Sequence, residues 1–251
     1  MSNINDYDHY AATRQKELKN GEKLPHRFVE KPAMRSVLPD LKGKHVLMLG
    51  CGTGEESLLL EEYGCTDMIG LDLSAESVRL ANETYPNYEF ISGDMHHLPF
   101  TDKAFDFVYS SLTVHYSNNP TAVYREVHRV LKPGGSFQFS VGHPVRWASD
   151  VVDINNAPVR MLGFTQGKDK PKLYGNYHTF SKHQDTFSDG MVVQYWIGAP
   201  SMHFSMLKQS GFVVDEFLET KAVEECKEVD ANYYERFSEF PQWAIFVAKK
   251  P

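Results

Sequence analysis

Short apolar runs alternate with amphipathic stretches through the middle of this sequence. Five runs have the length and composition of buried strands: 45–49, 68–71, 88–92, 105–111 and 136–142. Three stretches between them have the apolar spacing of helices: 55–63, 75–84 and 120–131. Strands that alternate with helices need crossover connections, and these favour a mostly parallel sheet with helices on both faces.

The two ends of the chain extend this pattern, and one segment interrupts it. Three more elements are predicted toward the carboxyl end: a helix at 200–210 and strands at 212–219 and 243–249. Residues 143–199 mix aromatic and polar side chains, and Asp189-Gly190 within them is typical of a hairpin turn. Residues 1–42 are polar and helix-prone, with three prolines, before any continuous apolar run appears.

These elements predict a single α/β domain over residues 1–251, with a Rossmann-like, seven-stranded, mostly parallel sheet. We expect four parts, namely an N-terminal helical cap, a core, an insertion after the fifth strand and a C-terminal completion of the sheet: 1–42, 43–142, 143–199 and 200–251. Ligands of such sheets bind outside the carboxyl ends of the strands, where the strand order reverses. The core is therefore the expected cofactor-binding part.

Composition narrows the class of protein. The formal net charge is −7, and Lys and Arg form no stripe that could follow a phosphate backbone, so nucleic acid is not an expected partner. No apolar stretch approaches the roughly 20 residues of a membrane span, and the start of the chain lacks the pattern of a signal peptide. The three cysteines are scattered, and neither they nor the histidines have metal-ligand spacing. We expect a cytoplasmic protein without a metal or a membrane partner.

A glycine-rich loop follows the first predicted strand. Gly50, Gly52 and Gly54 open the next helix, where glycines permit a tight turn and a close approach of backbone N–H groups to a ligand. Asp72 ends the second strand 22 residues after Gly50, a position from which a carboxylate can accept from ribose hydroxyls. The dinucleotide fingerprint needs a small residue where this chain has Glu55, which disfavours NAD without excluding it.

Five motifs in order carry a resemblance to a known family. The motifs are VLMLGCGTG, GLDLS, GDMHHLPF, FDFVYSSLTVHY and LKPGG. Their order and spacing over residues 45–142 resemble the class I S-adenosylmethionine (SAM) dependent methyltransferases of the small-molecule, ubiquinone-biosynthesis-like group. One departure is Met48, because the family usually has an acidic residue there that helps to hold the ammonium group of the cofactor.

The resemblance implies a set of cofactor-binding residues. Those expected under the methionine and ribose are the loop residues Gly50, Cys51, Gly52 and Gly54. Asp72, followed by Leu73, would accept from the ribose hydroxyls, and Asp94 from the adenine amino group, with the Met95 backbone beside the ring. Ser110 and Ser111 would line the methionine side.

The N-terminal cap resembles the same family at a YDxxA pattern. Tyr7, Asp8 and Ala11 match it, and in many relatives the aromatic residue covers the cofactor. An aromatic face near a sulfonium would also gain cation–π attraction. Arg14, one turn further, either meets the carboxylate of the cofactor or belongs to a solvated helix face.

Two histidines are candidates for the chemical step. Methyl transfer is an in-line displacement, so positioning of the acceptor supplies much of the rate, and a base is needed only if the acceptor keeps its proton. His115 lies in the loop after the fourth strand, and His143 lies just past the fifth. Eight aromatic residues of the insertion are suited to the walls of an acceptor site: Trp147, Phe164, Tyr174, Tyr177, Phe180, Phe187, Tyr195 and Trp196.

The sequence therefore predicts an enzyme that transfers a methyl group from SAM to an O, N or C nucleophile of a small-molecule acceptor, leaving S-adenosylhomocysteine. We expect a monomer or a homodimer. Two alternatives stay open at this point. Met48 and the lack of an acceptor motif would also suit a SAM-binding module without catalysis, and the loop with Asp72 alone would suit an NAD-dependent oxidoreductase.

Overall fold

A seven-stranded sheet forms the centre of the fold, with the strand order β12-β13-β5-β4-β1-β2-β3. The computed structural model describes residues 4–21, 23–167, 170–186 and 190–251. The strands of the sheet are β1 (His45–Leu49), β2 (Asp67–Asp72), β3 (Glu89–Ser92), β4 (Phe105–Ser110), β5 (Leu131–Gly142), β12 (Val213–Glu219) and β13 (Trp243–Lys249). β13 runs antiparallel to both neighbours, and the other paired strands are parallel. The mostly parallel sheet expected from the sequence is confirmed.

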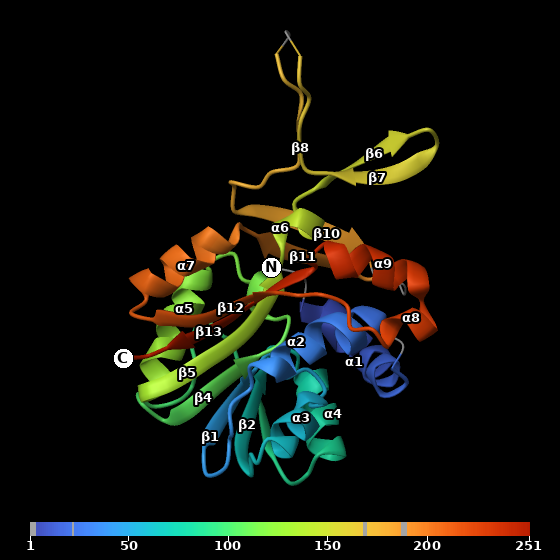
Figure 1. Ribbon diagram of the computed structural model, residues 1–251. Coiled ribbons are helices and arrows are strands. Elements are labelled where there is room, and N and C mark those ends of the chain that lie inside the picture. The colour runs from blue at the N-terminus through green and yellow to red at the C-terminus, as the bar shows by residue number, and fades with distance from the viewer. Residues whose placement is uncertain (1–3, 22, 168–169, 187–189) are drawn as a thin grey trace.

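Helices cover both faces of this sheet (Figure 1). One face carries α2 (Lys31–Ser36), α3 (Glu56–Glu62) and α4 (Ala75–Thr84), with α1 (Ile4–Lys19) against α4, and the other carries α5 (Pro120–Val130) and α7 (Pro200–Gln209). Alternate side chains of β1 pack against the two helical layers, because successive residues of a strand point to opposite faces of the sheet. Leu47 and Leu49 pack on the α5 side, whereas Val46 and Met48 pack on the α3 side.

The strand order reverses at β1, which lies between β2 and β4. The carboxyl ends of these strands therefore meet at one edge of the sheet. That edge brings together the glycine-rich loop, Asp72 and Ser110, which are far apart in the sequence. It is the place where a ligand of an open parallel sheet is expected.

The LKPGG motif differs from its expected form. We predicted a turn ahead of a strand at 136–142, but β5 already begins at Leu131. Phe105 of β4 pairs with Leu131 and Phe107 pairs with Ser136, so residues 132–135 bulge out of the ladder. Gly134 has a φ of +79°, which glycine adopts without strain.

The insertion consists of a short helix and three antiparallel ribbons. They are α6 (Pro144–Trp147), β6 (Asp150–Ile154) with β7 (Ala157–Met161), β8 (Gly163–Phe164) with β9 (Leu173–Tyr174), and β10 (Ser181–Thr186) with β11 (Val192–Ile197). The last ribbon is the hairpin expected around Asp189-Gly190, although Asp189 itself lies outside the described residues. Figure 1 shows β6 to β9 projecting from the body, while β10 and β11 lie against it.

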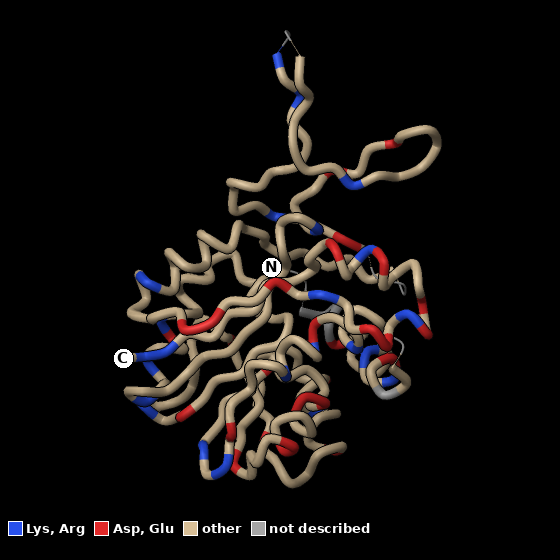
Figure 2. The backbone as a smooth tube through the Cα atoms, viewed as in Figure 1, with Lys and Arg blue, Asp and Glu red and all other residues tan. Residues whose placement is uncertain are grey.

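Four short elements have no counterpart in the sequence predictions: η1 (His26–Glu30), η2 (Val114–Tyr116), α8 (Cys226–Val229) and α9 (Ala231–Glu239). α9 packs with η1 around Trp243 at the start of β13. Each helix in the described part of the chain is too short or too polar to cross a lipid bilayer. Basic and acidic residues are interspersed along the tube in Figure 2.

Candidate functional site

The loop after β1 turns sharply because its glycines adopt positive φ. Gly50, Gly52 and Gly54 have φ angles of +71°, +54° and +88°. The N–H of Gly50 donates to the carbonyl of Leu71 at 2.7 Å, which joins the loop to the end of β2. A Cβ atom at Gly50 would lie 2.1 Å from Thr113 Oγ1. Both the backbone and the space at this position require glycine.

The carboxylate of Asp72 is fixed at the end of β2 by two backbone donors. Gly52 N–H donates to Oδ2 at 2.8 Å, and Ser74 N–H donates to Oδ1 at 2.9 Å. These bonds hold the carboxylate beside the glycine-rich loop and leave further lone pairs for a ligand. The next residue, Leu73, is 51% exposed and offers an apolar surface at the same edge.

The N-terminal helix is attached to this region through Asp8. Its Oδ1 accepts from Ser74 Oγ at 2.6 Å, and Ser74 is the N-cap of α4, where it accepts from Ser77 N–H. Ala11 of the YDxxA pattern is buried. Tyr7 lies on α1, but its side chain is outside the described residues.

Asp94 stands just after β3, beside the partly buried Met95. Its Oδ1 accepts from His96 N–H at 2.9 Å and from His96 Nδ1 at 2.6 Å, and His96 Nε2 lies 2.7 Å from Ser117 Oγ. Partial burial opposes ionisation of Asp94, but the bonds from His96 outweigh it and hold the pKa of the carboxyl below its usual value. The side chain is still 43% exposed, so it can meet a ligand.

Arg14 closes the other end of the loop. The position of a Cβ atom at Gly52 would be 2.0 Å from Arg14 Nη1. Burial opposes the charge of this guanidinium, but Glu55 and Asp72 outweigh it and raise its pKa. The structure thus places Arg14 at the site and not on a solvated helix face. Between it and the loop lies a cavity of about 10 Å³, with room for about one water, lined by Arg14, Leu18, His26, Met48, Gly50, Cys51, Glu55, Glu56, Tyr109 and Ser111.

A buried polar cluster below the cavity has no counterpart in the sequence predictions. His26 lies 3.0 Å from Glu30 through Nδ1 and 3.0 Å from Glu56 through Nε2. Lys31 Nζ lies 3.1 Å from Glu56 Oε1, and Tyr109 donates to Glu56 Oε2 at 2.8 Å. Burial disfavours the charge on His26, but the two carboxylates outweigh it and raise the pKa of the imidazole to about 9.

The two serines at the end of β4 have different surroundings. Ser111 Oγ donates to Glu30 Oε1 at 2.9 Å, so the serine that lines the cavity is joined to the buried cluster. Ser140 of β5 donates to the same oxygen at 2.7 Å. Ser110 Oγ is buried and has no hydrogen-bond partner among the described residues.

His115 lies in η2, directly beyond the end of β4. Its ring centroid is 4.6 Å from that of Tyr116 and 6.3 Å from that of Tyr195 on β11. Burial lowers the pKa of this imidazole to about 3. Nδ1 has no hydrogen-bond partner in the described part of the chain. The histidine is therefore neutral and has one ring nitrogen available.

His143 is turned toward the other edge of the sheet. Its Nε2 lies 3.0 Å from Glu219 Oε1 at the end of β12, and its Nδ1 accepts from Val145 N–H as the N-cap of α6. Burial lowers its pKa, and Glu219 opposes that shift. The ring contacts of His115 are with Tyr116 and Tyr195, so the structure gives the two histidines different partners.

The aromatic residues of the insertion divide into separate groups. Trp147 packs edge-on against Tyr195 with centroids 5.2 Å apart, on the His115 side. Phe180 stacks on Trp196. Phe164, Tyr174 and Tyr177 lie on or near the projecting ribbons, and Phe164 is 65% exposed. Phe187 is outside the described residues. The expected aromatic wall is thus formed mainly by two of the eight side chains.

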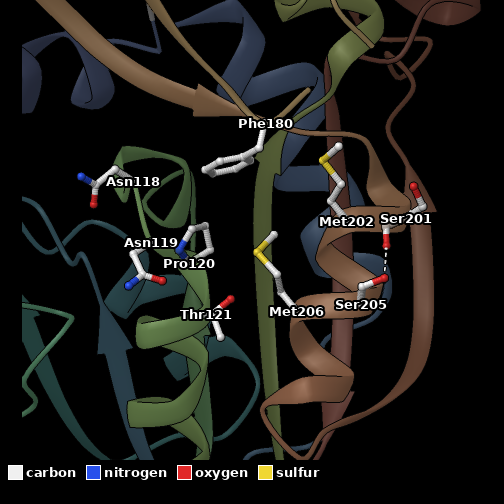
Figure 3. Close-up of a pocket in the computed structure, with 9 residues that line it drawn as sticks. All are labelled: Asn118, Asn119, Pro120, Thr121, Phe180, Ser201, Met202, Ser205 and Met206. Atoms are coloured by element: carbon white, nitrogen blue, oxygen red, sulfur yellow. Dashed lines mark hydrogen bonds between the residues drawn. The ribbon is translucent and has the colours of Figure 1, made fainter. Parts of the chain in front are cut away.

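A second pocket opens between the first turns of α5 and α7 (Figure 3). It has a volume of about 440 Å³ and is lined by Asn118, Asn119, Pro120, Thr121, Phe180, Ser201, Met202, Ser205 and Met206. Its lining is partly apolar, with two thioethers and one phenyl ring. Of the residues singled out from the sequence, Phe180, one of the eight aromatic candidates, lines this pocket.

The middle of the chain matches a known domain family. Residues 47–139 match the model of a methyltransferase domain. The chain is 35% identical over 150 residues to an uncharacterized protein of Haemophilus influenzae. This match covers 57% of this chain and 59% of the relative. It is 33% identical to a malonyl-[acyl-carrier protein] O-methyltransferase of Pectobacterium atrosepticum, over 42% of this chain and 41% of the relative. The chain spans about half the length of the curated relatives it matches.

Solved structures match more of the chain. A SAM-dependent methyltransferase from Mesorhizobium loti is 25% identical, with a TM-score of 0.67 over 88% of this chain and 97% of the other. A protein from Listeria monocytogenes described as a SAM-dependent methyltransferase shares the fold, with 24% identity and a TM-score of 0.69 over 88% of this chain and 96% of the other. Residues 47–139 are thus a methyltransferase domain, within a sheet that has the SAM-dependent methyltransferase fold.

The cofactor that this family and fold imply is SAM, and the dinucleotide alternative is not supported. The residues present fit it. Positive φ at the glycines lets the backbone approach a ligand, and the carboxylates of Asp72 and Asp94 end adjacent strands. The exposed face of Leu73 beside them suits an adenine ring. In the described residues, no group of three or more His, Cys, Asp or Glu side chains is arranged to hold a metal.

Proposed function

We propose that this protein transfers a methyl group from SAM to an oxygen of a small-molecule acceptor. The observation that carries the proposal is the pair of carboxylates, Asp72 and Asp94, at the ends of adjacent strands beside a loop of left-handed glycines. The methyltransferase domain supports the reaction class. Two relatives are named O-methyltransferases, of malonyl-[acyl-carrier protein] and of fatty acid, which favours an oxygen nucleophile.

The adenosine part is held by three features of the loop edge. Asp72, already oriented by two backbone N–H donors, accepts from the ribose hydroxyls. Asp94 accepts from the adenine amino group, and His96 keeps this carboxylate ionised. Leu73 and Met95 contact the ring. Charge-assisted bonds of this kind are roughly twice as strong as neutral ones.

The methionine part faces Arg14 and the cavity. The guanidinium pairs with the carboxylate of the cofactor, for which its planar fork is suited. The carboxylate missing at Met48 is replaced by Glu30, which reaches the cavity through Ser111. The methionine part of the cofactor needs far more than the 10 Å³ between Arg14 and the loop, so α1 must shift when the cofactor enters.

The chemical step rests on positioning. When bound, SAM supplies an electrophilic methyl group, and the protein has to place the acceptor oxygen in line with it. His115 holds the acceptor through its unpartnered ring nitrogen. With a pKa near 3, this imidazole is too weak a base to hold a proton near neutral pH, so it acts as a hydrogen-bond acceptor.

Calorimetric titration with SAM and S-adenosylhomocysteine tests the cofactor site. Asp72→Ala should weaken binding of both at least tenfold, because Asp72 is the only proposed partner of the ribose. Asp67→Ala is the matched control, since Asp67 begins the same strand and its side chain is 71% exposed. Mass spectrometry of a metabolite extract incubated with SAM tests transfer. Binding of SAM without any methylated product would contradict the proposed transfer reaction and would indicate a SAM-binding module without catalysis.

A further inference from the structure

Arg146 is a cation for which the described residues supply no ion-pair partner. It lies in α6, four residues after the end of β5, and its neighbour Trp147 packs against Tyr195 on β11. Its Nε and Nη1 atoms are buried and have no hydrogen-bond partner among residues 4–21, 23–167, 170–186 and 190–251. The guanidinium carbon lies 4.9 Å from the ring centroid of Trp147, which is a cation–π contact.

The groups around Arg146 do not neutralise it. Arg160 repels it, while Asp185 attracts it. None of the carboxylates in the described ranges lies within ion-pair distance of Arg146, Asp185 included. Burial dominates and lowers the pKa of the guanidinium from its usual value. Polar groups that are buried in proteins are ordinarily hydrogen-bonded, so the two buried N–H groups of this partly buried side chain call for a ligand.

The surroundings connect Arg146 to the candidate acceptor site. The neighbouring Trp147 packs against Tyr195, whose ring also faces His115 at 6.3 Å and stacks with His183 at 6.2 Å. Two aromatic side chains, Trp147 and Tyr195, thus connect the guanidinium to the neutral imidazole beyond β4. The arrangement offers a planar cation at one end, an aromatic wall, and a hydrogen-bond acceptor at the other.

We propose that Arg146 binds a carboxylate of the acceptor, and that the acceptor is a small organic acid with an apolar or aromatic body. This inference rests on the proposed function. A carboxylate can accept from Nε–H and Nη2–H, which share one edge of the guanidinium, as Glu126 does from Arg129. Nε of Arg146 has no hydrogen-bond partner among the described residues. Arg160 provides additional positive charge on the same side.

A ligand-binding role and a structural role predict opposite effects on stability. A structural arginine would lower the melting temperature when replaced. Arg146→Met keeps the length and the contact with Trp147 but removes two buried N–H groups that have no partner among the described residues, so the melting temperature should stay equal to that of the wild type or rise. A clear fall in the melting temperature would contradict the proposal. Arg125→Met is the matched control, because Arg125 is exposed on α5.

Benzoate, benzamide and phenyl phosphate are the probes, titrated by calorimetry into the wild type, Arg146→Met and Arg125→Met. We expect saturable benzoate binding that weakens at least tenfold in Arg146→Met and is unchanged in Arg125→Met, with no binding of benzamide. Tighter binding of phenyl phosphate than of benzoate would overturn the carboxylate assignment. Equal benzoate binding by wild type and Arg146→Met, or none by the wild type, would overturn the site.

The same protein samples separate this inference from the proposed function. S-adenosylhomocysteine should bind Arg146→Met as it binds the wild type, because Arg146 is not part of the cofactor site. Benzoate binding that depends on Arg146, in a protein that does not bind S-adenosylhomocysteine, would uphold the anion site and defeat the methyltransferase proposal. If S-adenosylhomocysteine binds and benzoate binding does not depend on Arg146, the anion site would be rejected and the methyltransferase proposal would stand.

Discussion

His26 Nε2 lies 3.0 Å from Glu56 Oε1, beneath the cavity at the glycine-rich loop. One partner comes from the N-terminal segment and the other from the first turn of α3. The pair joins the cap to the helix that the loop opens, and its protonation state is set by the fold.

This pair should make stability depend on pH. The pKa of His26 is raised from 6.5 to about 9, so its contribution is complete below pH 6.5 and is lost as the pH rises through 9. The shift corresponds to about 3 kcal/mol of unfolding free energy over that window. Urea unfolding of His26→Gln should show a shallower decline between pH 6.5 and 9.5. His178→Gln, at an exposed site, is the control, and parallel curves for wild type and His26→Gln would contradict the assignment.

Gly50 and Gly43 separate steric contact from backbone strain. Their φ angles are +71° and +70°, but a Cβ atom at Gly50 would meet Thr113 whereas one at Gly43 would meet open space. Gly43→Ala should cost about 1–2 kcal/mol of unfolding free energy from the left-handed backbone alone. Gly50→Ala should cost at least about 1 kcal/mol more. Equal costs in urea unfolding would show that the loop adapts to the methyl group.

His96 should control the pH range in which adenosine binds. Its hydrogen bonds hold the pKa of Asp94 down, so the carboxylate stays ionised to lower pH than usual. In His96→Ala, the affinity for S-adenosylhomocysteine should begin to fall at a higher pH than in the wild type as the pH is lowered. His97→Ala is the comparison, because the adjacent, exposed His97 acts on Asp94 through its charge without a hydrogen bond, so this variant should shift the profile less than His96→Ala does. Identical pH profiles for His96→Ala and the wild type would remove His96 from the site.

Arg14 should matter for the methionine end of the cofactor. Replacing it with alanine removes a charge-assisted pair worth about 1.5–3 kcal/mol, so the dissociation constant for SAM should rise by about tenfold or more. Arg14→Lys should restore part of the affinity, since lysine keeps the charge but not the planar fork. Lys16→Ala, exposed on the same helix, should bind as the wild type does. Tighter binding by Arg14→Ala would show that Arg14 only obstructs the site.

The sheet was predictable because its signal is local. Each strand is encoded by an apolar run and a following turn that together span only a few residues. β1, β2 and β3 therefore lie within one residue of their expected bounds. The LKPGG bulge was not predictable, because a proline and two glycines read as a turn and only pairing with β4 shows that the strand starts earlier. The helices α8 and α9 were not predicted. Their apolar side chains pack with η1, which is far away in the sequence, so the contact leaves no local signal.

The candidate site was predictable where it follows strands. Asp72, Asp94 and the glycines sit at fixed offsets from strand ends, so their meeting at one edge follows from the topology. Glu30 and His26 have no fixed offset from the end of a strand. They belong to the N-terminal segment, and only the folded structure brings Glu30 into contact with Ser111, just after β4. The same holds for Arg146, because only the folded structure shows that its Nε and Nη1 atoms are buried without a hydrogen-bond partner among the described residues. A single charged residue in a helix of four residues leaves no periodic signal.

The projecting ribbons β6 to β9 have a consequence for how this lineage can change. Their apolar side chains, such as Phe164 and Leu173 at 65% and 69% exposure, are mostly outside the packed core. Insertions, deletions and substitutions there disturb few buried contacts, so they carry little risk of unfolding the sheet. Natural selection can therefore reshape this segment quickly, while the strands behind it accumulate differences slowly.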